Sequence, residues 1–205
     1  RSMNVDPAAV DFTIRAGEGP ARVIGIIPEQ IVTEDLRLEP TVEDGAVVAD
    51  PARDLAKLAV VERHRGTGRT GLGLVHGLGL RRGALASSVA HDSHNVVVAG
   101  AGDDDMRAAL AAVVEMGGGQ VVVDGGRVLA ACPLPSAGLM SDRPLPEVRD
   151  QVAALTEAAH GLGSSLPDPL MTMSFLALPV IPALKLTDRG LVDVIRFDFV
   201  PMFEG

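Results

Sequence analysis

Residues 83–100 read GALASSVAHDSHNVVVAG, and this stretch decides the fold that we expect. Two apolar runs, Ala84–Ala90 and Val96–Ala99, have the length and the glycine boundaries of buried β-strands. A connection between such strands is normally a short Asn-Gly turn. Polar groups beside a core cost free energy unless they are paired or used, so this connection predicts a functional site. The polar residues that form it are His91, Asp92, Ser93, His94 and Asn95.

These five residues allow two interpretations. Imidazole and carboxylate groups are ligands of Zn, Fe and Mn, so His91, Asp92 and His94 are candidate metal ligands if they point into one pocket. Alternatively, Asp92 and Asn95 form side-chain-capped turns and the histidines bond to the main chain. Both interpretations stay open from the sequence. A Ser–His–Asp triad is disfavoured, because no GxSxG turn is present to expose a serine hydroxyl.

Composition restricts the partners. The chain has 205 residues and a net charge of −9 at pH 7, which repels a phosphate backbone. Aromatic residues make up only 2% of it, with no Trp or Tyr to stack on bases. The longest apolar stretch, Leu170–Leu184, is interrupted by prolines and is too short to cross a bilayer. We therefore expect no nucleic-acid or membrane partner. The single cysteine, Cys132, fits a reducing, cytoplasmic setting and a buried packing position.

The remaining pattern predicts an α+β fold with mixed, largely antiparallel sheets. Short apolar or alternating runs, among them 10–16 and 31–42, indicate a β-rich lead-in over residues 1–60. Residues 61–205 read as an α+β domain, and the two parts together as one compact unit over residues 4–205. Proline, glycine and acidic boundaries predict helices at 106–116, 144–160 and 169–178. A hairpin is expected at 120–131, and the total is about eight to ten strands with three or four helices.

Residues 65–80 are rich in glycine and contain GTGRTG at 66–71, a literal GxGxxG. A dinucleotide site would also need an acidic residue about twenty positions later, and none stands there. The stretch is therefore interpreted as a structural loop with close backbone packing. Just before it, Glu62 and His64 alternate on one strand face, which favours a half-exposed strand end over a pocket.

Three segments carry a resemblance to a known family. They are residues 60–100, which include the stretch above, residues 115–142 (EMGGGQVVVDGGRVLAACPLPSAGLMSD) and residues 168–194 (DPLMTMSFLALPVIPALKLTDRGLVDV). Together they resemble the C-terminal domain of bacterial adenine deaminase, of the amidohydrolase superfamily. The upstream segments at 11–16 and 22–33 are similar to the family's lead-in. The resemblance covers nearly all of the chain, in the family's order.

The resemblance implies a hydrolase of purine metabolism that converts adenine and water to hypoxanthine and ammonia with a divalent metal (Fe, Mn or Zn). The metal ligands of that family lie in a (β/α) barrel and begin with HxH. This chain has no HxH, and such a barrel needs about 250 residues. We expect the chain to lack the metal-binding barrel, to hold no cofactor itself and to be inactive alone, with His91–Asn95 as a substrate-site or second-layer segment beside the barrel. The alternative is a non-catalytic docking, stabilising or oligomerisation module.

Overall fold

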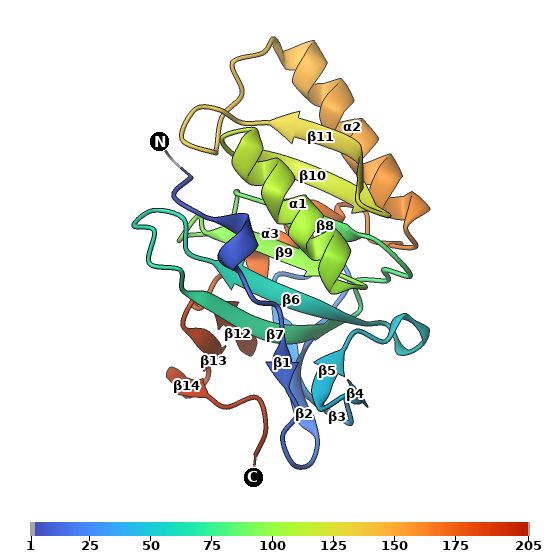
Figure 1. The fold of residues 1–205 in the computed structure, drawn as a ribbon, viewed down its shortest axis with the longest axis vertical. Helices are drawn as coiled ribbons and strands as arrows, with labels where there is room; N and C mark the ends of the chain where they lie inside the picture. Colours follow the sequence, from blue (N-terminus) through green and yellow to red (C-terminus); the bar gives the residue numbers. More distant parts are fainter. Residues whose placement is uncertain (1–2, 205) are drawn as a thin grey trace.

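The computed structural model describes residues 3–204, whose strands form three sheets (Figure 1). The largest sheet has eight strands, and all of its neighbouring pairs are antiparallel except β2 with β7. In spatial order these are β11 (Arg127–Pro133), β10 (Gly119–Asp124), β8 (Ala84–Ser87), β9 (Val96–Gly100), β6 (Leu55–Val61), β7 (Thr70–His76), β2 (Ala21–Ile26) and β3 (Thr33–Leu38). The predicted α+β class with largely antiparallel sheets is confirmed.

Both faces of this sheet are covered, and the apolar runs follow from that. In β6, Leu58 and Val60 face one core cluster, whereas Ala59 and Val61 face the other. A strand buried on both sides needs continuous rather than alternating apolar residues. The first face carries α2 (Leu145–Gly161), α3 (Pro169–Phe175) and a small sheet of β12 (Leu184–Thr187), β13 (Gly190–Asp193) and β14 (Asp198–Val200). The second face carries α1 (Asp103–Glu115) and the N-terminal segment (Figure 1).

The third sheet is formed near the N-terminus. Its strands are β1 (Ile14–Arg15), β5 (Ala46–Val48) and β4 (Thr41–Glu43), and two short 3-10 helices stand at η1 (Pro7–Ala9) and η2 (Pro51–Arg53). β2 and β3, which lie between β1 and β4 in the sequence, belong to the large sheet instead. The division at residue 60 stays a prediction. No helix among residues 3–204 is both long enough and apolar enough to span a membrane.

Several sequence-based boundaries were wrong. The structure has fourteen strands between residues 3 and 204, more than expected, because several are short. The run at 31–42 is divided between β3 and β4 at Pro40, which has no N–H for a ladder. Within 10–16 only Ile14–Arg15 is strand. Seven of the sixteen residues of the glycine-rich stretch 65–80 are strand β7 rather than loop. The hairpin and all three helices are confirmed within a few residues.

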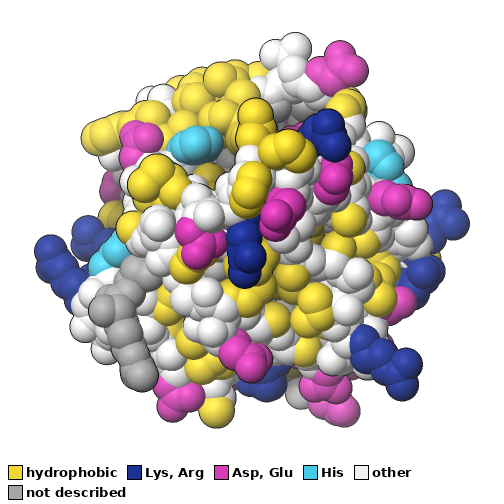
Figure 2. All heavy atoms as spheres, turned by 90° about the horizontal axis from the view of Figure 1, so that it is seen from above, with side chains coloured by type: hydrophobic (Ala, Val, Ile, Leu, Met, Phe, Trp, Pro, Cys, Tyr) yellow, Lys and Arg dark blue, Asp and Glu magenta, His cyan; other side chains and the backbone are white. Residues whose placement is uncertain are grey.

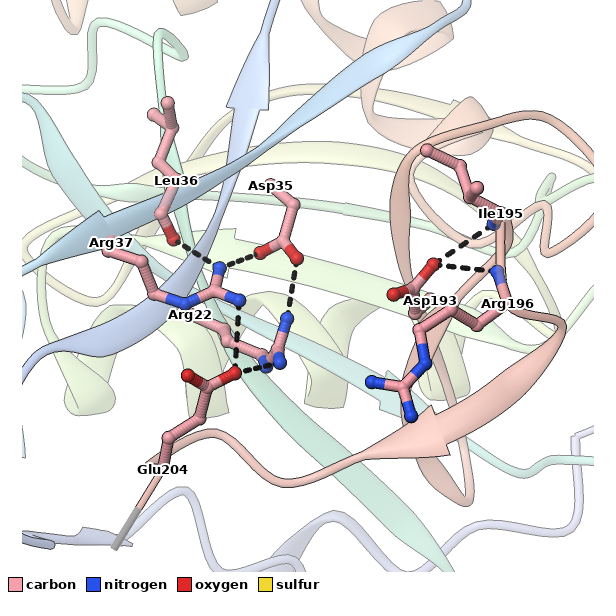
Figure 3. A network of polar contacts seen from close by, with 8 residues as sticks. All are labelled: Arg22, Asp35, Leu36, Arg37, Asp193, Ile195, Arg196 and Glu204. Carbon is pink, nitrogen blue, oxygen red and sulfur yellow. Dashed lines mark hydrogen bonds and ion pairs between the residues drawn. The ribbon is translucent and has the colours of Figure 1, made fainter.

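The edge strand β3 is tied to the C-terminal segment by charges (Figure 3). Asp35 pairs with Arg22 and Arg37, and both arginines also pair with Glu204. Arg22 is only 6% exposed, so its ion pairs are partly shielded from water. The segment that follows β13 is therefore anchored at its end, rather than hanging free from the small sheet.

Candidate functional site

The five predicted site residues connect β8 to β9, two central strands of the large sheet. Asp92 and Ser93 are exposed, His91 and His94 are half-buried, and Asn95 is buried. The segment therefore stands where the sheet ends and reaches the surface. A covering body could contact it there, whereas a deeply enclosed pair of imidazoles could not meet any partner.

Two residues from the loop after β6 hold this segment by its main chain. Arg63, only 2% exposed, donates from Nε to the carbonyl of His94 and from Nη2 to the carbonyl of Ala137 at 2.9 Å. The Nε2 atom of His64 lies 2.8 Å from the carbonyl oxygen of Ser93. Both contacts end on backbone oxygens. The conformation of the segment is thus fixed without using the side chains of His91 and His94.

The two imidazoles lie close together. Their ring centroids are 6.1 Å apart in an edge-to-face arrangement, and the His91 ring lies 4.8 Å from the Phe175 ring. Burial lowers the pKa of His94, and the nearby His91 and Arg63 lower it further, while Asp92 opposes them. His94 is therefore mainly neutral at pH 7, with one ring nitrogen to donate and one to accept. Its Nδ1 atom is buried and meets no hydrogen-bond partner among residues 3–204.

Asn95 also carries a buried polar atom of this kind, and it contacts Asp188, for which the sequence indicated no functional role. Its Oδ1 is buried without a partner within residues 3–204, whereas its Nδ2 donates to Asp188 at 3.3 Å. Asp188 also accepts from Arg69 at 2.9 Å. The sequence predicted only a turn at Asp188, and it does lie in the β12–β13 turn. Nothing in its local pattern points to a contact 93 residues away.

Glu62 is buried rather than half-exposed, which corrects the prediction. It is 5% exposed and accepts hydrogen bonds of 2.6–3.0 Å from the main-chain N–H groups of His64, Arg65 and Thr67. The Thr67 hydroxyl adds a bond of 2.8 Å. Burial alone would raise the pKa of Glu62, but these hydrogen bonds outweigh it and lower the pKa to about 2. The carboxylate thus shapes the loop that brings His64 to Ser93.

Glu62→Gln should destabilise the chain by about 2 kcal/mol at pH 7, because an amide NH2 would then face N–H donors. The native pKa is below its ordinary 4.5, so the carboxylate's contribution is present above pH 4.5 and is lost as pH falls toward 2. Urea unfolding at pH 7, 4 and 3 should show a smaller acid loss in the variant. The exposed Glu115, changed to Gln, is the control and should shift stability by under about 0.5 kcal/mol. Equal acid profiles for wild type and Glu62→Gln would contradict this role.

The structure does not support the metal-ligand interpretation of the segment. Among residues 3–204, no three His, Cys, Asp or Glu side chains converge as a metal site would require. A metal-binding role of His91, Asp92 and His94 therefore finds no support among the described residues and stays a prediction.

The nearby serines and the cysteine have structural positions. Ser88 is fully buried, donates from Oγ to the Gly138 carbonyl at 2.6 Å and accepts from the Gly119 N–H at 2.8 Å. Ser87 is equally buried. Cys132 is 1% exposed and burial raises the pKa of its thiol, so the predicted packing role is confirmed.

Known proteins match this chain over most of its length. Residues 30–198 match the family model described as adenine deaminase C-terminal domain. The adenine deaminase of Desulfatibacillum aliphaticivorans is 56% identical over 203 residues, which are 99% of this chain and 36% of that protein. The adenine deaminase of Methanothrix thermoacetophila is 53% identical over 192 residues, 94% of this chain and 34% of the relative. The chain thus spans about a third of the length of the curated relatives that it matches. It belongs to the adenine deaminase C-terminal domain family.

Proposed function

We propose that this chain is the C-terminal domain of a cytoplasmic adenine deaminase of the amidohydrolase superfamily. The enzyme would break the C6–N bond of adenine and form a C6–O bond from water, giving hypoxanthine and ammonia. Family membership and the roughly threefold greater length of the relatives support this proposal. A (β/α) barrel outside this chain would supply the divalent metal, Fe, Mn or Zn, that activates the water. The chain alone would be inactive.

Within that enzyme, the 91–95 segment would face the mouth of the barrel and help to position or enclose adenine. One observation carries this role. Arg63 and His64 hold the segment by its backbone carbonyls, while the imidazoles of His91 and His94 remain half-buried at the end of the sheet. The neutral His94 could meet purine nitrogen atoms as donor or acceptor.

The test uses a chimeric enzyme in which this chain replaces the aligned 203 residues of the Desulfatibacillum aliphaticivorans relative. His91→Ala and His94→Ala should each lower kcat/KM for adenine by about tenfold or more, as expected when a positioning contact is lost. His160→Ala is the control, because His160 is exposed at the end of α2, and its kinetics should match those of the unmodified chimera. Unchanged kinetics in both loop variants would reject the positioning role. Adenine turnover by the 205-residue chain alone, with added divalent metal, would reject the inactive-domain proposal.

The alternative, a docking or oligomerisation module, has its own supporting observation. β11 is an edge strand of the large sheet, and its Val128 and Leu129 are each 51% exposed. Figure 2 shows the face above this strand, where hydrophobic side chains reach the surface among charged ones. An apolar edge strand is a common site of association. Size-exclusion chromatography of the chain, with Val128→Lys as comparison, separates a dimer from a monomer.

A further inference from the structure

The chain uses aromatic residues sparingly but exposes two of them together. It has five Phe and neither Trp nor Tyr. Phe12 is completely buried, whereas Phe197 and Phe199 are 77% and 46% exposed. Aromatic side chains bury large areas and are enriched in protein interfaces. Two exposed Phe side chains at one place therefore indicate a surface that another body covers.

These two Phe side chains line a groove of about 450 Å³ beside the candidate site. Pro179 and Asp188 contribute to its walls, and Ser93 of the 91–95 segment is part of its lining. The Arg189 guanidinium lies 5.0 Å from the centre of the Phe199 ring. The groove thus combines an apolar interior with charged groups, which is the usual anatomy of an interface. Through Ser93, the groove directly adjoins the candidate site.

The segment that carries Phe197 and Phe199 is held in one conformation by hydrogen bonds and strand pairing. Asp193 Oδ1 accepts hydrogen bonds of 3.0 Å from the main-chain N–H groups of Ile195 and Arg196 (Figure 3). In β14, Phe199 is paired with Val192 of β13. Ile195 is 76% exposed in the turn so formed. The apolar side chains are therefore presented in a defined geometry, which lowers the entropy cost of binding.

We infer that this groove is the surface on which the catalytic barrel domain docks, with one or two apolar side chains of that domain inserted between Phe197 and Phe199. The inference rests on the proposed function, because Ser93 belongs both to the 91–95 segment and to the groove. A domain that covers the segment at Ser93 therefore reaches the edge of the groove. About two thirds of each relative's length lies outside the matched region and provides such a domain. A second copy of this chain seated in the groove would instead block the segment from the barrel.

Hydrogen exchange tests the docking directly, without using activity. Amide exchange of the 205-residue chain is compared with that of the chimeric enzyme. Amides at 195–199 should exchange about tenfold or more slowly in the chimera, because docking suppresses local opening. Those of Gly125 and Gly126, in the β10–β11 turn, are the internal reference and should change less than about twofold. Equal exchange at 195–199 in both proteins overturns the inference. Slowing in the isolated chain as its concentration rises would identify a second copy as the occupant and overturn it too.

A matched pair of variants separates docking from the role of the histidines. Phe197→Asp in the chimera should abolish the slow exchange at 195–199 and lower kcat/KM for adenine by about tenfold or more. Leu145→Asp is the control, since Leu145 is similarly exposed, at 79%, and an acid suits the first turn of α2. It should leave both values unchanged. Slow exchange that persists in Phe197→Asp would contradict the inference. Protection of 195–199 with unchanged kinetics in His91→Ala and His94→Ala would leave docking standing and reject the proposed positioning role.

Discussion

Replacing Gly71 by alanine should destabilise the chain by about 3 kcal/mol, although the strand around it is regular. Gly71 lies in β7, where the β12–β13 turn crosses the sheet. A Cβ atom at this position would stand 1.8 Å from the carbonyl oxygen of Thr187, and backbone on both sides prevents an easy shift. The displaced turn includes Asp188, so the contact with Asn95 should also weaken.

The control for this effect lies two residues along the same strand. A Cβ at Gly73 would meet the Leu186 and Leu191 side chains at 3.5–3.6 Å, an ordinary van der Waals distance. Gly73→Ala should therefore be neutral or slightly stabilising, because alanine restricts the unfolded chain. Urea unfolding of both variants provides the measurement. If Gly71→Ala is as stable as Gly73→Ala, the close approach of the turn to β7 is wrong.

For Gly71 and Gly73, the sequence predicted the close packing but not the strand in which they lie. Close backbone packing was predicted for residues 65–80, and Gly71 packs in that way. The strand itself was not predicted, because glycine is depleted in strands and no local pattern reveals that the small sheet needs the missing side chains. The buried strands β8 and β9 were identified, since continuous apolar runs are their direct consequence.

The candidate site was predicted in part for the same physical reason. The polar residues 91–95 stand out between apolar runs, so their place between β8 and β9 follows from local sequence. The positions of Arg63 and Glu62, which hold this segment and its neighbouring loop, do not follow from local sequence. The bonds of Arg63 to the carbonyls of His94 and Ala137 depend on tertiary contacts over 31 and 74 residues. Glu62 was misplaced because only the folded loop reveals how many N–H donors converge on it.

The chain has two lysines, and both are buried. They differ in the partner of the ammonium group. Lys57 is 3% exposed and its Nζ lies 2.7 Å from Asp103 Oδ1. Lys185, in β12, has no exposed surface, and its Nζ donates to the carbonyl of Ile31 at 2.8 Å. Burial lowers the pKa of Lys185 from 10.5 to about 8. Its ammonium form is therefore disfavoured in the native state.

Stability should consequently rise with pH in the alkaline range. Between pH 8 and 10.5 the unfolded chain binds the proton of Lys185 more tightly than the native chain, so the free energy of unfolding increases with pH. The penalty is full below pH 8, at about 3 kcal/mol, and is absent above 10.5. The chain has no Tyr, and urea unfolding between pH 8 and 9 measures the rise below the ordinary pKa of 9.0 of the Cys132 thiol, whose burial opposes the rise at higher pH.

Lys185→Met should remove both the penalty and the pH dependence. At pH 7 the variant should be about 2 kcal/mol more stable, since the relief of a buried charge exceeds the loss of one hydrogen bond. Its stability should be nearly constant from pH 8 to 9. Lys57→Met is the matched control and should instead lose stability, because it removes the partner of Asp103. A Lys185→Met variant that is less stable than wild type at pH 7, with the alkaline rise intact, would show that the ammonium group finds compensation in the native state and that its burial is not a cost.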